Sequence, residues 1–312
     1  MSAAAAFDLQ GHRGARGLAP ENTLLAFARA LSIGVTTLEM DAGLTEDGVV
    51  VIIHDRRLNP DIARGADGRW ATGRPPAIRE LTYRELQRYD VGRVRPGSEY
   101  SSRWPDQRRA DKVRIPTLEE VFELTRHARN SEVRFNIETK ISPEAPDETA
   151  DPERFTRALI KVVRDNGMAA RTTIQSFDWR TLAVVQKEAP EVSTSYLTSQ
   201  QQSLDNIQAG HREDSAWTAG IQFRDHGSVP KMVKAAGGRI WSPYFGDLTE
   251  AALKEAHTLG LAVLPWTVND RADMERLMAW GVDGIITDYP DRLREVMAAK
   301  GLPLPRPTPV TP

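Results

Sequence analysis

Two acidic residues, Glu39 and Asp41, lie two positions apart in the short, β-prone segment 37–43. Residues two apart in a strand point to the same side, so we expect both carboxylates to project together. Such a pair is repulsive and costly to remove from water, which predicts a positive charge between its members. A turn followed by the apolar run 49–53 predicts a hairpin that brings His54 close to the same place.

A third carboxylate, Glu138, lies in segment 133–140, which also has the composition of a strand. Together with Glu39 and Asp41 it would form a hard-oxygen site. Such a site suits calcium or magnesium, with water and substrate oxygens completing the coordination. Zinc is a poorer match, because the chain has no cysteine and no pair of histidines at ligand spacing.

Two cations accompany these acids. Arg13 adjoins His12 at the end of an expected first strand, and Lys140 follows Glu138 by two residues on the same side of its strand. Fixed cations and a divalent metal stabilise a phosphate whose charge shifts during displacement. His12 and His54 then offer a general acid and a general base. The pattern indicates a metal-assisted phosphodiesterase.

Three aromatic residues are further candidates for substrate binding, because they fall at or near the ends of expected strands. They are Phe177, Trp241 and Trp266. Lining a pocket and simple burial in the core are equally compatible with these positions.

Strand-like and helical segments alternate along the chain, which predicts a parallel sheet covered by helices. About eight such units give a (β/α)8 TIM barrel, and we expect one domain over residues 7–300. An open doubly wound sheet is the main alternative, but no glycine-rich phosphate fingerprint follows the first strand. In a barrel the carboxyl ends of the strands carry the chemistry, so the polar residues above would converge on one face.

Residues 56–114 interrupt this alternation and are rich in arginine, glycine, proline and aspartate. We expect them to form an insertion, a small lobe over one end of the barrel after the second-strand hairpin. Their arginine-rich segment 103–114 is better explained as a solvated loop than as a nucleic-acid patch, because acidic residues are interspersed. Five prolines in residues 303–312 predict an extended tail over 301–312, outside the fold.

The composition limits which partners the protein can bind and in which cellular compartment it can work. The net charge of -2 provides no basic field for nucleic acid, and no apolar run approaches the roughly 20 residues that span a bilayer. The first residues are similar to the small-residue end of a signal peptide. We therefore expect a periplasmic or secreted protein if a signal peptide has been removed, and a cytoplasmic one otherwise.

A set of short motifs, in order from residue 11 to residue 288, resembles the glycerophosphodiester phosphodiesterase family of the phospholipase C-like phosphodiesterase barrels. The motifs are Gly11-His-Arg-Gly14, Pro20-Glu-Asn-Thr23, Leu38-Glu-Met-Asp41, Val51-Ile-Ile-His-Asp55, Pro116-Thr-Leu-Glu-Glu120, Ile137-Glu-Thr-Lys140, Pro265-Trp-Thr-Val-Asn269 and Asp283-Gly-Ile-Ile-Thr-Asp288. The resemblance implies a (β/α)8 barrel, one divalent metal, commonly calcium or magnesium, and hydrolysis of glycerophosphodiesters to an alcohol and glycerol 3-phosphate.

Matched motif by motif, the resemblance implies that His12 and His54 are the catalytic pair, and that Arg13 and Lys140 bind phosphate. The family's metal ligands correspond to three acids: Glu39, Asp41 and Glu138. The insertion 56–114 matches the family's insertion, but it lacks the usual Arg-Thr-Thr-x-Gly run after the His-Asp pair. This difference bears on substrate choice rather than on the chemistry.

Several alternatives stay open. A lysophospholipase D-like or sphingomyelinase D-like phosphodiesterase, or a cyclising lyase, would use the same barrel. A non-catalytic barrel that binds phosphorylated ligands and a sugar-phosphate isomerase are the other candidates. We expect a small-molecule glycerophosphodiester as partner, with no nucleic acid and no stable membrane insertion, in a monomer or homodimer. His12 is the favoured base and His54 the favoured acid, and the attacking oxygen belongs to the glycerol 2-hydroxyl or to water.

Overall fold

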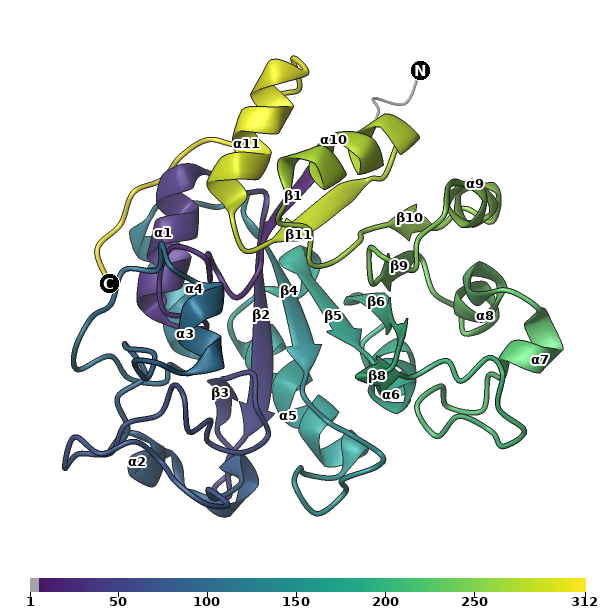
Figure 1. Cartoon of the computed structure of the whole chain (residues 1–312). Helices are drawn as coiled ribbons and strands as arrows, with labels where there is room; N and C mark the ends of the chain where they lie inside the picture. Colours follow the sequence, from purple (N-terminus) through teal and green to yellow (C-terminus); the bar gives the residue numbers. More distant parts are fainter. Residues whose placement is uncertain (1–5) are drawn as a thin grey trace.

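The computed structural model describes residues 6–312. Eight parallel strands form a nearly closed barrel with helices on its outside (Figure 1), which confirms the predicted (β/α)8 fold. The strands are β1 (Asp8–Gly11), β2 (Thr37–Leu44), β4 (Arg134–Thr139), β5 (Thr172–Ser176), β6 (Ser193–Thr198), β9 (Ile240–Pro243), β10 (Ala262–Val263) and β11 (Gly284–Thr287). Around the barrel they follow the order β10-β9-β6-β5-β4-β2-β1-β11.

The seam between β10 and β11 is closed by backbone hydrogen bonds around the two strands. Asp283 N–H donates to the carbonyl of Val263 at 3.1 Å, and Ile286 N–H donates to that of Pro265 at 3.0 Å. The strand β10 is short and ends at Val263. Pro265 has no N–H to give to a ladder, which limits regular pairing beyond this point.

The outer layer follows the predicted alternation. Its main helices are α1 (Leu24–Ile33), α4 (Leu118–His127), α5 (Pro152–Asp165), α6 (Trp179–Glu188), α8 (Val229–Ala235), α9 (Glu250–Thr258), α10 (Arg271–Trp280) and α11 (Pro290–Ala299). A capping box stabilises the start of α4, because Thr117 and Glu120 each accept the other's backbone N–H. Over the described residues, no helix combines the length and the apolar character that crossing a membrane requires.

The region after β6 is irregular. Residues 217–222 contain a turn and lead into α7 (Phe223–His226). A small hairpin, β7 (Gln200–Gln201) and β8 (Leu204–Asp205), precedes them. A 3-10 turn, η2 (Ala169–Arg171), precedes β5.

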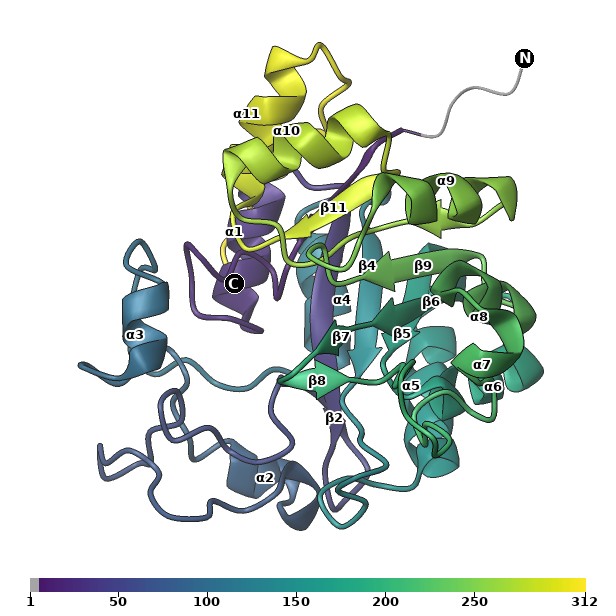
Figure 2. The ribbon, with the colours of Figure 1, turned by 45° about the vertical axis from the view of Figure 1, so that its right-hand side comes forward.

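The insertion lies beyond the carboxyl end of β2 (Figure 2). It is entered through β3 (Val50–Ile52), which pairs antiparallel with β2, and it contains η1 (Ile78–Glu80), α2 (Tyr83–Leu86) and α3 (Glu99–Arg103). A separate cluster of buried side chains packs within the insertion and against the residues that flank it: Val51, Leu58, Ala63, Ile78, Leu86, Val91 and Ile115. This second core makes the lobe a folded unit rather than an open loop.

The proline-rich tail was expected to lie outside the fold, and this expectation is wrong. Thr308 is buried, and its N–H donates to the carbonyl of Leu31 at 2.8 Å. Asn130 Nδ2 donates to Thr308 Oγ1 at 3.0 Å, and Arg294 Nη1 donates to the carbonyl of Pro305 at 2.6 Å. Composition indicated an extended chain correctly, but an extended chain can still satisfy its backbone groups against a surface.

We predict that removal of residues 303–312 lowers the free energy of unfolding by roughly 2 kcal/mol, because hydrogen bonds and packing against α1 are lost. Urea unfolding monitored by circular dichroism measures this change. A matched control lacks only residues 311–312, which no hydrogen bond described above involves. Equal unfolding midpoints for the two truncated proteins would contradict the packing of the tail.

Candidate active site

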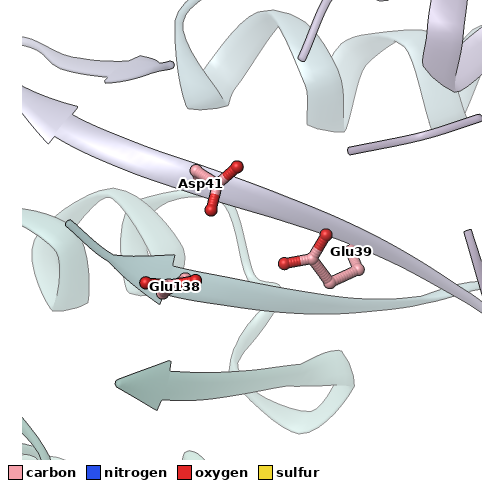
Figure 3. Close-up of side chains that lie close together, drawn as sticks. All are labelled: Glu39, Asp41 and Glu138. Atoms are coloured by element: carbon pink, nitrogen blue, oxygen red, sulfur yellow. The ribbon is translucent and has the colours of Figure 1, made fainter. Parts of the chain in front are cut away.

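Three carboxylates gather toward the carboxyl ends of β2 and β4, as the sequence predicted. Glu39 and Asp41 come from β2 and Glu138 from β4, and each offers an oxygen within 4.8 Å of the other two. Figure 3 shows the three side chains on these neighbouring strands. Asp41 lies opposite Glu138 in the parallel register, and all three residues are buried. The two-residue spacing and the register together produce the cluster.

Glu39 is held through both carboxylate oxygens. Its Oε2 accepts the backbone N–H of Arg13 at 2.8 Å, and its Oε1 accepts Gln175 Nε2 at 2.8 Å. Arg13 adopts a left-handed backbone with φ of 49° in the turn after β1. Since the two donors come from the β1 turn and from β5, three parts of the barrel fix one carboxylate.

The other two acids are less fully engaged. Asp41 Oδ2 accepts Asn22 Nδ2 at 2.8 Å, and Glu138 Oε1 accepts Lys140 Nζ at 2.7 Å. Asp41 Oδ1 is buried and accepts no hydrogen bond, with Lys140 Nζ 3.8 Å away. A buried carboxylate oxygen without a donor is costly, so this atom suits direct ligation of a cation.

The electrostatics of the cluster also favour a cation. Burial, followed by the charge of Asp41, raises the pKa of Glu39 well above its ordinary value. Burial raises the pKa of Glu138 to about 7, even though Lys140 lowers it. Burial also opposes ionisation of Asp41, but Arg13 keeps the pKa of that carboxyl below its usual range. The resident cations therefore stabilise one carboxylate fully and leave two incompletely compensated.

Two histidines lie beside the carboxylates, and each is oriented by an aspartate. His12 Nδ1 lies 2.7 Å from Asp288 Oδ1, and His54 Nδ1 lies 2.8 Å from Asp55 Oδ1. Because a carboxylate only accepts, each Nδ1 carries the hydrogen and each Nε2 is left for proton transfer. This arrangement is the one that a general acid–base pair requires.

Burial lowers the pKa of both rings below the ordinary value of histidine. Burial lowers the pKa of His12 to about 4, against the opposing effect of Asp288. Burial, and then the charges of Arg13 and Lys140, lower the pKa of His54 to about 3. A neutral imidazole with a free Nε2 is ready to accept a proton.

A cavity of about 150 Å³ joins these groups. Larger hollows of about 300 and 840 Å³ exist elsewhere, but neither contains a histidine or any of the three clustered acids. The cavity is lined by both histidines, two of the acids, three cations and an apolar wall: His12, His54, Glu39, Glu138, Arg13, Arg16, Lys140, Gln175, Phe177, Leu197, Trp266, Thr267 and Ile286. The charged groups and an apolar surface therefore line the same cavity.

The predicted aromatic residues divide into two groups. Phe177 and Trp266 line the cavity and pack edge to face with ring centroids 5.3 Å apart. Trp241 was also predicted to bind substrate, but it is only 3 % exposed and does not line the cavity. Its indole N–H donates to Thr198 Oγ1 at 2.9 Å, which satisfies the polar atom within the core.

Known proteins share this architecture along nearly the whole chain. The sequence profile of the glycerophosphoryl diester phosphodiesterase family matches residues 12–292. This chain belongs to that family. It is therefore a phosphodiesterase. A relative from Caldanaerobacter subterraneus subsp. tengcongensis, named glycerophosphodiester phosphodiesterase, is 29 % identical over 93 % of this chain and 97 % of its own length.

Solved structures agree with this membership. A protein from Silicibacter pomeroyi, described as a putative glycerophosphoryl diester phosphodiesterase, is 36 % identical and superposes with a TM-score of 0.83, over 96 % of both chains. An Oleispira antarctica phosphodiesterase in complex with the product sn-glycerol-3-phosphate has a TM-score of 0.66 at 22 % identity. It covers 93 % of this chain and 96 % of its own, and it shares the fold.

Some site residues of this phosphodiesterase were not predicted individually. Asp55 and Asp288 orient the histidines, and Asn22 and Glu21 support Asp41 and Arg13. Each lies within one of the motifs quoted above. The signal for Asp55 was its position next to His54. The partnership of Asp288 with His12 spans 276 residues, and only the closed barrel brings them together.

We predict that calcium, magnesium or manganese stabilises the folded protein by filling the carboxylate cluster. A cation at roughly a hundredfold its Kd adds about 2.7 kcal/mol. The thermal unfolding midpoint should therefore rise with added cation in the parent. The rise should shrink or vanish in Glu39→Gln and Glu138→Gln, which remove a ligand charge.

Glu119→Gln is the matched control, since Glu119 is exposed on α4 and lies outside the cluster. An equal cation-dependent rise in all four proteins would place the cation elsewhere. This readout is independent of turnover.

Proposed function

We propose that this enzyme hydrolyses glycerophosphodiesters to an alcohol and sn-glycerol 3-phosphate, with a divalent metal and with His12 and His54 as acid–base pair. One observation carries the proposal: two of the three clustered carboxylates line a single cavity together with two aspartate-oriented imidazoles and fixed cations. The names of the relatives in the family support the substrate class.

The proposed metal ligands are Glu39, Asp41 and Glu138. A divalent ion held there would neutralise phosphate oxygens and increase the electrophilicity of the phosphorus. Calcium and magnesium both prefer the oxygen ligands that this cluster offers.

Arg13 and Lys140 are the proposed phosphate-binding cations. Both line the cavity, and both are already paired with acids, Arg13 with Glu21 at 2.8 Å and Lys140 with Glu138 at 2.7 Å. These pairs pre-orient the cations, so little reorganisation is needed when a phosphate arrives. The edge-to-face pair Phe177 and Trp266 would contact the carbon atoms of the substrate on the apolar side of the cavity.

In the proposed reaction, His12 Nε2 takes the proton of the attacking oxygen as that oxygen bonds to phosphorus. The bond from phosphorus to the leaving alcohol breaks. His54, which has taken up a solvent proton at Nε2 once the anionic phosphate lies beside it, delivers that proton to the departing oxygen. If the attacking group is the glycerol 2-hydroxyl, a cyclic phosphate forms and water opens it. If the attacking group is water, glycerol 3-phosphate forms directly. Asp288 and Asp55 hold each Nδ1–H throughout.

We predict that His54→Ala and His12→Ala each lower kcat on glycerophosphocholine by about two to four orders of magnitude, because general acid or base assistance is lost. Steady-state assays measure the change. His127→Ala is the matched control, since the side chain of His127 is exposed and does not line the cavity. Turnover by His54→Ala within tenfold of the parent would show that the assignment of this histidine is wrong.

We further predict that EDTA abolishes turnover, and that calcium, magnesium or manganese restores it, since the cluster is incompletely compensated without a cation. The assay uses a panel of glycerophosphodiesters together with lysophospholipids and sphingomyelin. Preferred cleavage of the latter two, or a cyclic phosphate as the final product, would favour the lysophospholipase D-like, sphingomyelinase D-like or lyase alternatives. Full activity in EDTA would contradict the proposed metal dependence.

A further inference from the structure

We propose that Arg16 and Trp104 form a brace that positions His12 for catalysis. Trp104 belongs to the insertion and Arg16 to the loop after β1, and neither residue is assigned a role in the mechanism above. The inference rests on the proposed function. It extends that function by linking the insertion to the orientation of the His12 ring.

The first half of the brace is a fork between Arg16 and Asp288. Arg16 Nε donates to Asp288 Oδ1 at 2.8 Å, and Arg16 Nη2 donates to Oδ2 at 3.1 Å. The same Oδ1 lies 2.7 Å from His12 Nδ1, and Asn269 Nδ2 donates to Oδ2 at 2.7 Å. Asp288 is completely buried. Its carboxylate plane is therefore fixed by several donors, and the plane fixes the imidazole.

The second half of the brace holds Arg16 itself. The guanidinium carbon of Arg16 lies 4.3 Å from the centre of the Trp104 ring, a distance typical of cation–π stacking. The insertion also contacts the backbone of the same loop. Gln107 Nε2 donates to the carbonyl of Arg16 at 2.8 Å, and Arg108 N–H donates to that of Leu18 at 3.0 Å.

Stacking matters because Arg16 lines the cavity and has other acids within reach. Arg16 Nη1 lies 3.8 Å from Glu21 Oε2, a buried oxygen that accepts no hydrogen bond. An arginine released from the ring could turn toward Glu21 or toward a bound phosphate. Asp288 would then lose two hydrogen-bond donors. Its carboxylate, which accepts from His12 Nδ1, would be free to rotate, and the His12 ring would be less firmly oriented. A planar guanidinium held on an aromatic face loses less entropy per hydrogen bond, so the fork is favoured.

The expected effect is on the chemical step. Trp104→Ala should lower kcat by about 10-fold to 100-fold, because small displacements of a catalytic group have effects of this size. KM should stay within about threefold, and the loss should be similar for glycerophosphodiesters with different leaving alcohols. Trp104→Phe keeps an aromatic face and should recover most of the loss. Arg16→Lys keeps the charge but lacks the fork, and it should behave like Trp104→Ala.

Trp70→Ala is the matched control. Trp70 lies in the same insertion and also has an arginine near its ring, Arg64 at 6.0 Å, but it does not line the catalytic cavity. Its kcat should equal that of the parent. If Trp104→Ala acts only by loosening the lobe, both variants should lose activity in proportion to their loss of stability, and the brace would be refuted.

A spectroscopic readout tests the brace independently of turnover. The chain has only six histidines, so nitrogen-15 spectra of histidine-labelled protein can resolve the tautomer of each ring. His12 should populate the Nδ1–H tautomer in the parent and in Trp70→Ala, and a tautomer mixture in Trp104→Ala and Arg16→Lys. His54, paired with Asp55 outside the brace, is the internal reference and should not change.

The outcomes separate the two proposals. An unaltered His12 signal together with parent-like kcat in Trp104→Ala overturns the brace, whatever the substrate. A parent that turns over no glycerophosphodiester overturns the proposed function, and the tautomer of His12 in the variants still reports on the brace.

Discussion

The mutual repulsion of three buried carboxylates is the constraint on which the rest of the site depends. Glu39, Asp41 and Glu138 share a volume too small for three uncompensated charges. The barrel surrounds them with donors from the β1 turn, from β5 and from the residue after β4. These contacts compensate the charge only in part, and the uncompensated negative charge is what makes the cluster a candidate site for a cation.

The closed sheet converts local spacing into this arrangement. Parallel strands direct their carboxyl ends to one side of the barrel, so side chains from distant segments meet without long loops. The pairing of β1 with both β2 and β11 is decisive, because it places Glu39 on one side of His12 and Asp288 on the other. The carboxylate cluster and the two histidines beside it therefore depend on the same few strand pairings.

Most of the fold and the chemical groups of the site were predictable from sequence, because they follow from short-range periodicity. Two-residue spacing aligned Glu39 with Asp41, and Lys140 with Glu138. What could not be predicted depends on tertiary packing. The burial of Trp241 and the stacking of Trp104 on Arg16 have no periodic signal. An extended chain such as the proline-rich tail shows no amphipathic pattern, so its contacts with α1 could not be predicted from the sequence either.

The insertion departs from the barrel directly after His54 and returns to touch the loop that follows His12. We expect that exchange of this segment between relatives would alter substrate choice. In a chimera, however, the graft would also replace the ring beneath Arg16. It would replace Asn59 as well, which donates a hydrogen bond to Asp55, the partner of His54. Donor segments should therefore be chosen for an aromatic residue at the position of Trp104, or transplanted together with their own β1–α1 loop.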